Sequence, residues 1–150
     1  MSAPSFRYIV RIAGMDIDGN LKVAYGLAKI KGVGVTLAYA LCRTLGIDPE
    51  KRIGFLTESE VKKIEDALAN PKPLGLPPWL LNRRKDYTTG EDKHYVGADL
   101  IMVVREDIER LKRIKCWRGI RHALGLKVRG QRTRTTGRTG ITVGVKRRRK

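Results

Sequence analysis

Hydrophobic residues recur three and four positions apart in several stretches of this chain, and glycines separate these stretches. Such spacing places apolar side chains on one face of a helix. It predicts one helix from Asn20 to Gly32, with Asn20 as its cap, and another from Gly34 to Gly46. The turn Lys31–Gly34 joins the two predicted helices.

A capping box is the strongest local signal for a third helix. Thr57 and Glu60 are placed so that each side chain can bond the backbone amide of the other, while Leu56 and Val61 occupy the hydrophobic positions around them. This pattern predicts a helix that begins after Thr57.

The N-terminal end has strand character. From Phe6 to Ile12 aromatic and aliphatic residues alternate with arginine, although Ile9 breaks the alternation, so we expect a short strand or an extended arm. The stretch from Gly14 to Asn20 is rich in Gly, Asp and Asn, and it predicts a turn.

Helical spacing fails between residues 70 and 97, where four prolines interrupt the chain. A loop of this length is uncommon in a compact domain unless it has a function or docks on something. Helical spacing resumes from Asp99 to Lys115, and a short helix from Trp117 to Leu124 is expected to end at Gly125. Beyond it, glycines among Arg and Thr residues predict an extended tail.

These elements predict a mainly α fold, a small helical domain with a short N-terminal strand or arm and an extended basic C-terminal tail. With 150 residues, 41% of them hydrophobic, the chain can bury one core. We therefore divide it into a helical body over residues 1–125, with an inserted loop at about 70–97, and a tail over residues 126–150.

The charge of the chain is concentrated at its C-terminal end. From Arg110 to Lys150 there are sixteen Lys and Arg residues and no Asp or Glu. The first 109 residues hold sixteen basic and fifteen acidic side chains, so they contribute only +1 to the formal charge of +17. This density of like charge disfavours a compact free state and indicates a polyanionic partner, with nucleic acid the leading candidate.

Composition and spacing argue against several other classes of protein. No apolar run approaches the ~18 residues of a membrane span, and the N-terminus lacks a secretory pattern, so we expect a soluble, intracellular protein. Cys42 and Cys116 are far apart and are expected to be reduced thiols, with Cys42 buried on a helix. His94 and His122 are isolated too, so we predict no metal and no other cofactor.

The Lys31–Gly34 turn is a candidate phosphate site. Its glycines let the backbone approach a partner closely, and free amide groups at the start of the second helix, together with Lys31, favour an anion. Two helices linked in this way resemble helix-hairpin-helix and helix-two-turn-helix modules, which hold nucleic-acid backbones without reading sequence. The alternative, an interhelical turn that needs glycine only for its backbone angles, stays open.

The C-terminal region offers further candidates for nucleic-acid contact. Arg118, Arg121 and His122 would share one helical face. The adjacent Trp117 is expected to pack in the core rather than stack on a base. From Val128 to Gly140, arginines alternate with residues that carry hydroxyl and amide donors. These groups bind phosphate oxygens and ribose hydroxyls, so the pattern favours contact with nucleic acid over a merely solvated surface.

Two segments of this region, Arg110–His122 and Gly125–Thr139, resemble the C-terminal signature of the small-subunit ribosomal protein thirteen family. Arg11–Gly14 and Ile30–Gly34 are similar to the N-terminal half of that family, so the resemblance spans essentially the whole chain. The insertion, including Pro77–Asp86, departs from the shorter bacterial pattern and is similar to the archaeal and eukaryotic branch, of which we favour the archaeal. The bacterial pattern implies no role for this insertion.

The resemblance implies a structural protein, not an enzyme, at the top of the small-subunit head in the cytoplasmic ribosome. Members of the family bind head-domain rRNA, contact small-subunit protein nineteen, and bridge to large-subunit rRNA and large-subunit protein five. Their C-terminal tail reaches peptidyl-site tRNA.

Carried over residue by residue, the resemblance assigns three groups of residues. Those expected to bind rRNA are Lys31, Gly32, Val33, Gly34, Arg118, Arg121, His122, Arg129, Gln131, Arg132, Thr133, Arg134, Thr135 and Arg138. Those expected to contact tRNA are Lys146, Arg147, Arg148, Arg149 and Lys150. Those expected to face the large subunit are Met15, Asp16, Asp18 and Asn20.

Two rival functions stay open at the level of sequence. DNA glycosylases with a helix-two-turn-helix module share a basic domain and a glycine turn, but they need a catalytic nucleophile and a base pocket, and no residue cluster here proposes either. An abasic-site cleavage assay would distinguish a DNA glycosylase from a protein that only binds nucleic acid.

A free-standing nucleoid protein or RNA chaperone would bind duplex DNA well and be abundant outside ribosomal particles, whereas a ribosomal protein would co-sediment with small subunits.

Overall fold

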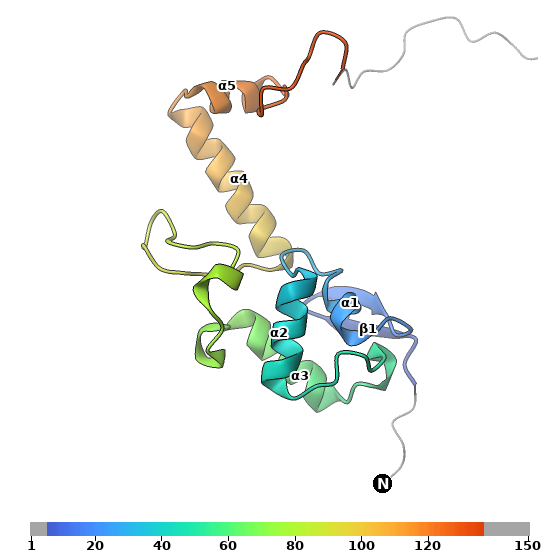
Figure 1. Ribbon diagram of the computed structural model, residues 1–150. Coiled ribbons are helices and arrows are strands. Elements are labelled where there is room, and N and C mark those ends of the chain that lie inside the picture. Colours follow the sequence, from blue (N-terminus) through green and yellow to red (C-terminus); the bar gives the residue numbers. More distant parts are fainter. Residues whose placement is uncertain (1–5, 137–150) are drawn as a thin grey trace, which may run out of the picture. The chain divides into compact units, whose positions relative to one another are not determined.

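A small antiparallel hairpin and a set of helices make up the computed structural model, which describes residues 6–136 (Figure 1). The described elements are, in chain order, β1 (Ile9–Ile12), β2 (Met15–Asp18), α1 (Val23–Leu27), α2 (Val35–Leu45), the 3-10 helix η1 (Ile53–Phe55), α3 (Glu58–Ala69), the 3-10 helices η2 (Lys72–Leu74) and η3 (Pro78–Leu80), α4 (Gly97–Arg113) and α5 (Trp117–Ala123). The predicted mainly helical class is confirmed. The chain divides into a first unit up to Met102 and a second unit from Val103 onward.

The N-terminal hairpin pairs β1 with β2, with Ile12 opposite Met15. Its two-residue turn, Ala13–Gly14, has φ angles of 49° and 75°, as a tight hairpin requires. Alternate apolar side chains of β1 are buried, so the predicted N-terminal strand is confirmed. The segment 14–20 was predicted as a turn and is instead a strand over most of its length, because Ile17 is buried against the core.

α1 is shorter than the sequence predicts. Asn20 does not cap it, because the Asn20 backbone N and Nδ2 both donate to Asp18 Oδ1, at 2.9 and 3.1 Å, in the turn that follows β2. After Leu27 the chain makes tight turns, in which the amides of Ile30 and Val33 each donate three residues back, at 3.0 Å. One long helix was expected here, and a short helix followed by turns is observed.

α2 and α3 agree with the prediction. Gly34 is the N-cap of α2, and Gly46 ends it with a φ of 68°. At the start of α3, the Glu60 amide donates to Thr57 Oγ1 at 3.3 Å, and the Thr57 amide donates to Glu60 Oε2 at 2.7 Å, so the capping box is formed. α3 therefore begins at a side-chain cap, whereas α2 begins at a glycine that has no side chain to cap it.

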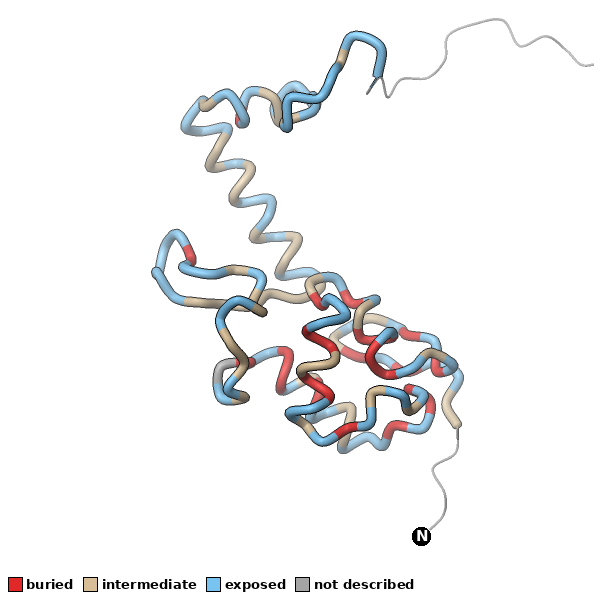
Figure 2. The backbone as a smooth tube through the Cα atoms, in the orientation of Figure 1, coloured by how far each residue is buried: buried red, intermediate tan, exposed pale blue. Residues whose placement is uncertain are grey.

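The core of the first unit lies between the hairpin, α1, α2, η1 and α3 (Figure 2). These elements are short, and each contributes one to four fully covered apolar side chains. The largest of them are Ile12, Leu27, Ile30, Leu41, Ile53, Leu56 and Ile64. Their burial is what holds the Lys31–Gly34 turn in place, since residues on both sides of that turn lie in the core.

In the second unit, α5 packs closely on the end of α4. A side chain at Gly119 would collide with the Leu111 carbonyl, so glycine is required there. The Cys116 thiol donates to the same carbonyl at 3.5 Å and its sulfur accepts from the Gly119 amide at 3.4 Å. α5 and its end at Gly125, where φ is 66°, agree with the prediction, and α4 begins two residues before the predicted Asp99.

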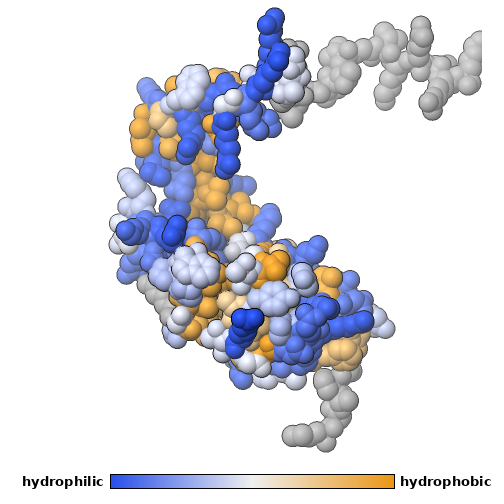
Figure 3. Space-filling model, viewed as in Figure 1, coloured by the Kyte–Doolittle hydropathy of each residue, from blue (hydrophilic) through white to orange (hydrophobic). Residues whose placement is uncertain are grey.

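Apolar side chains remain exposed along α4, which has no fully buried residue (Figure 3). Among the described residues, no helix is long and apolar enough to cross a membrane. Residues 126–136 contain no helix or strand. The proposed division into a body (1–125) and a tail (126–150) stays a prediction, because residues 137–150 lie outside the described part of the chain.

Candidate nucleic-acid interface

The Lys31–Gly34 turn presents one exposed cation beside exposed backbone. Lys31 is exposed, whereas the Val33 side chain is 5% exposed and belongs to the core, so Val33 offers only its backbone to a partner. Gly34 has no side chain with which to cap α2, and the first turn of α2 has no acidic residue. A helix start without a capping side chain and without an acid favours a bound anion, so the start of α2 stays a candidate phosphate site.

The two glycines of this turn have different roles. Gly32 has a φ of 98°, and a Cβ there would lie 2.5 Å from the Tyr95 carbonyl oxygen, so only glycine fits. Gly34 has a φ of −94°, and nothing lies within 4 Å of an added Cβ. The backbone angle requires glycine at Gly32 but not at Gly34, and the space in front of Gly34 is open to a partner.

On α5, an arginine and a tryptophan form the most ordered part of the predicted basic face. The Arg121 guanidinium lies 5.8 Å from the centre of the Trp117 ring, and its Nε donates to the Lys127 carbonyl at 2.9 Å. Arg118 is exposed and His122 is half-buried. Trp117 was expected in the core, and this is wrong because its side chain is 73% exposed on a helix that packs mainly through Gly119.

The described part of the predicted Arg-Thr segment is almost entirely exposed. Thr133 is half-buried, and the Thr136 hydroxyl donates to the Arg132 carbonyl at 2.5 Å. The exposed members of the predicted set are Arg129, Gln131, Arg132, Arg134 and Thr135. Arg138 and the predicted tRNA-contacting residues Lys146–Lys150 lie outside the described residues.

The four residues predicted to face the large subunit come together on the hairpin. Asp16 and Asp18 are exposed at alternate positions of β2, and Met15 is half-buried against the core. Asn20 is exposed and bonded to Asp18. The hairpin therefore carries an acidic edge, in contrast to the basic surfaces above.

Sequence reasoning left the insertion without a role, and the structure places it against the predicted phosphate site. The Gly97 amide donates to the Lys31 carbonyl at 2.8 Å. The Tyr95 carbonyl that excludes a side chain at Gly32 also belongs to the insertion. A signal was present in the sequence, because residues 71–85 contain no acid and end in Arg83–Lys85.

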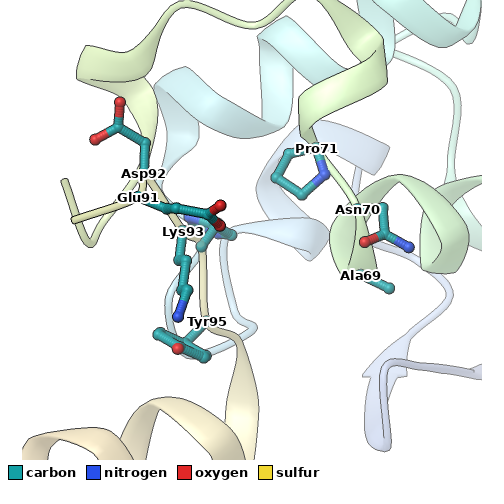
Figure 4. Close-up of a pocket in the computed structure, with 8 residues that line it drawn as sticks. Ala69, Asn70, Pro71, Glu91, Asp92, Lys93 and Tyr95 are labelled. Atoms are coloured by element: carbon teal, nitrogen blue, oxygen red, sulfur yellow. The ribbon is translucent and has the colours of Figure 1, made fainter. Parts of the chain in front are cut away.

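The insertion also rests on the end of α3, where a pocket of about 290 Å³ separates residues 69–71 from residues 91–95 (Figure 4). His94 belongs to this lining. Its Nδ1 accepts from the Asn82 amide at 3.2 Å, and burial lowers the pKa of the imidazole below its usual value of 6.5. The polar groups at this pocket thus hold the insertion together.

Among the described residues, neither cysteine lies in a cluster that could hold a metal ion. Cys42 is buried on α2 as predicted, and burial raises the pKa of its thiol to about 11. Over residues 6–136 no three His, Cys, Asp or Glu side chains gather in a way that could hold a metal ion.

Comparison with known proteins decides the family. The chain matches the family described as Ribosomal protein S13/S18 over residues 11–139. The chain belongs to this ribosomal protein family. It is 69% identical over 149 residues to the small ribosomal subunit protein uS13 of Staphylothermus marinus, with 99% of each chain covered. It is 70% identical to that of Hyperthermus butylicus, with 97% of each chain covered, and 55% identical to that of Methanocaldococcus jannaschii over the full length of both.

Membership of the ribosomal protein S13/S18 family confirms the resemblance seen in the sequence. It also confirms the prediction of a structural RNA-binding protein of the small ribosomal subunit and not an enzyme, so the DNA glycosylase reading is set aside. The three relatives are archaeal, in agreement with the archaeal and eukaryotic branch that the insertion resembles and with the preference for the archaeal side of that branch.

Proposed function

We propose that this ribosomal protein binds the rRNA of the small-subunit head through two surfaces, the Lys31 turn and the basic C-terminal region. The observation that carries the proposal is the distribution of charge. Sixteen cations and no acid follow position 109, and six of the nine predicted contacts described in that region are exposed. A surface of this kind gains free energy by releasing counterions from RNA phosphates.

The geometry of the Lys31 turn supports its role in backbone binding. An exposed lysine, open space before Gly34 and an uncapped helix start without acids offer charge and amide donors to a phosphate. No base-reading side chain lies in the turn. We therefore expect it to position the protein on rRNA rather than to select a sequence.

The basic C-terminal region combines two kinds of contact. Arg118 and Arg121 on α5 offer planar donors that suit phosphate oxygens. The Arg-Thr segment, of which Arg138 is the last predicted member, adds hydroxyl and amide donors for ribose and phosphate. The exposed Trp117 beside Arg121 gives this surface an aromatic face on which an unpaired base could stack.

Contacts beyond rRNA follow from the family resemblance. The acidic edge at Met15–Asn20 would face the large subunit, through its rRNA and protein five. Exposed apolar side chains of the second unit, such as Val104 and Ile114, support contact with a protein, for which small-subunit protein nineteen is the candidate. The terminal Lys146–Lys150 would contact the backbone of peptidyl-site tRNA.

Co-sedimentation tests the proposed function. The native protein should travel with small subunits through a sucrose gradient at high salt. Recovery outside the ribosome, with tight binding to duplex DNA, would favour the free-standing nucleoid protein or RNA chaperone instead.

Removal of Lys146–Lys150 tests the tail separately. Incorporation into small subunits should stay near normal, while tRNA should leave the peptidyl site faster, most visibly at higher salt. Rates of tRNA dissociation equal to those of intact subunits would contradict this role of the tail. Failure of the shortened protein to assemble would contradict it too.

A further inference from the structure

The insertion hairpin, residues 82–95, is folded around one buried carboxylate. Asp86 is 6% exposed, and its oxygens accept from Arg83 Nε at 2.5 Å and from Lys93 Nζ at 3.0 Å. The hydroxyls of Thr88 and Thr89 donate to Asp86 Oδ2 at 2.8 and 3.2 Å. These charge-assisted bonds lower the pKa of the Asp86 carboxyl and keep it ionised.

Backbone bonds close the same hairpin. Arg83 and Lys93 exchange amide-to-carbonyl bonds of 3.2 and 2.8 Å. Asp92 is turned inward, because its Oδ1 accepts from the Lys85 amide at 2.8 Å. Lys85 has a φ of 48°, a conformation that non-glycine residues seldom adopt, so the hairpin holds this position against local strain.

The base of the hairpin packs against the Lys31 turn, to which the following Gly97 is bonded. Asn82 makes two bonds to Tyr95, with Nδ2 donating to the Tyr95 carbonyl at 2.6 Å and Oδ1 accepting from the Tyr95 amide at 3.0 Å. That carbonyl is the group that excludes a side chain at Gly32. The base of the hairpin and the candidate phosphate site therefore form one continuous surface of the first unit.

Two cations of the hairpin are left outside this internal network. Arg84 and Lys85 are exposed, and no ion pair of either side chain occurs within residues 6–136. They line one open depression with Pro78, Asn82 and Asp92. Residues 82–95 hold four cations and three acids, and Arg84 and Lys85 are the two of these cations that form no ion pair with the described residues, although Asp92 lines the depression beside them.

We propose that the insertion hairpin is a second, pre-folded rRNA contact that extends the Lys31 turn, with Arg84 and Lys85 binding backbone phosphates. This inference rests on the proposed rRNA-binding function of that turn. Arginine offers a planar fork and lysine a point charge to phosphate oxygens. Because Asp86 orders the hairpin backbone before binding, RNA has to order only the side chains of these two cations, and less free energy is lost on association.

The test measures binding of the full chain to a transcript of the small-subunit head rRNA at several salt concentrations. Replacement of both cations, Arg84→Ala with Lys85→Ala, should weaken binding roughly tenfold and lower the salt slope by about 1.4 to 1.8, as expected for two lost phosphate contacts. The matched control replaces Lys62 and Lys63 of α3, which are also exposed and carry the same charge. This control should weaken binding less than about twofold.

Asp86→Ala separates a positioning role from a merely structural one. It should weaken binding in the wild-type background and add little when Arg84 and Lys85 are already alanine, because both changes act through the same contact. Equal losses in both backgrounds would contradict the inference.

Equal affinities for the Arg84/Lys85 variant and the Lys62/Lys63 control would overturn the role of the insertion. In that case, a loss of binding on deletion of residues 126–150 would show that the proposed rRNA function still stands. If the wild-type protein itself fails to bind the transcript, both the proposed function and this inference are wrong. Unchanged thermal unfolding of the Arg84/Lys85 variant would show that the loss arises from RNA contact.

Discussion

The two units of this protein differ in how they manage charge and apolar surface. In the first unit, some cations are paired with acids, as in Lys51–Glu60 at 3.1 Å and Lys93–Asp86 at 3.0 Å, and apolar side chains from five short elements meet in one core. In the second unit, Gly119 is the only fully buried residue among those described, and no acid follows position 109. The first unit is therefore stabilised by its own packing, while for the second unit we expect a polyanion to add stability.

Deletion of residues 126–150 should show the largest effect of this difference. If roughly six to ten phosphates are contacted, the affinity of the intact protein for its RNA should fall on the order of a thousandfold between about 50 and 200 mM salt. The deletion should remove much of that slope while the helical body stays folded. An unchanged slope, measured by filter binding, would contradict the assignment of this region as the main electrostatic contact.

Matched truncations in the two units should show where the folding free energy lies. Leu41→Ala removes a side chain that is 1% exposed, and it should cost about 3 kcal/mol of unfolding free energy. Ile120→Ala removes one that is 42% exposed, and it should cost less than about 0.5 kcal/mol. Urea unfolding followed by circular dichroism measures both, and similar costs would contradict the contrast between the units.

The glycines of the Lys31 turn should separate folding from binding. Gly32→Ala combines a φ of 98° with a collision at the Tyr95 carbonyl, so it should cost about 2 kcal/mol of stability or more. Gly34→Ala meets no atom within 4 Å, so it should change stability by less than about 1 kcal/mol.

Lys31→Ala should weaken RNA binding by about 1 kcal/mol without changing stability. If Lys31→Ala binds normally, the turn only connects two helices.

Lowering the pH should destabilise the insertion because His94 takes up a proton. This is the smallest of the expected effects. Because burial holds the pKa of His94 below 6.5, the unfolded chain takes up this proton first, so stability is complete above pH 6.5 and falls as the pH drops through the folded pKa. Protonation of Nδ1 would also remove the acceptor of the Asn82 amide. His94→Gln should flatten the dependence of stability on pH between about pH 7 and 5. Identical pH dependence in the variant and the wild-type protein would contradict this role.

The candidate site was only partly predictable from sequence. The turn, the basic face of α5 and the Arg-Thr segment follow from residue types at short spacing, and the structure leaves most of these side chains exposed. Val33 and Trp117 show where prediction of the site from sequence fails. Val33 is covered by a core assembled from distant elements, and Trp117 is exposed because its helix packs through Gly119.

What the sequence by itself determined is local chemistry and family. The Thr57–Glu60 capping box, the end of α2 at Gly46 and the uncompensated C-terminal charge depend on neighbours along the chain, so they can be read from it directly. Family membership follows from motifs that extend over most of the chain.

Only the tertiary structure decided which distant groups meet. Ile17 is buried and therefore lies in a strand, although its neighbours have turn chemistry. Asp86 is ionised and buried because Arg83 and Lys93 reach it across a hairpin without helical or strand periodicity. The bond from Gly97 to Lys31 joins this hairpin to the candidate phosphate site across more than sixty residues, and no local pattern encodes it. Long-range contacts of this kind depend on how the whole core packs, which is why the insertion acquires a candidate function only in the folded protein.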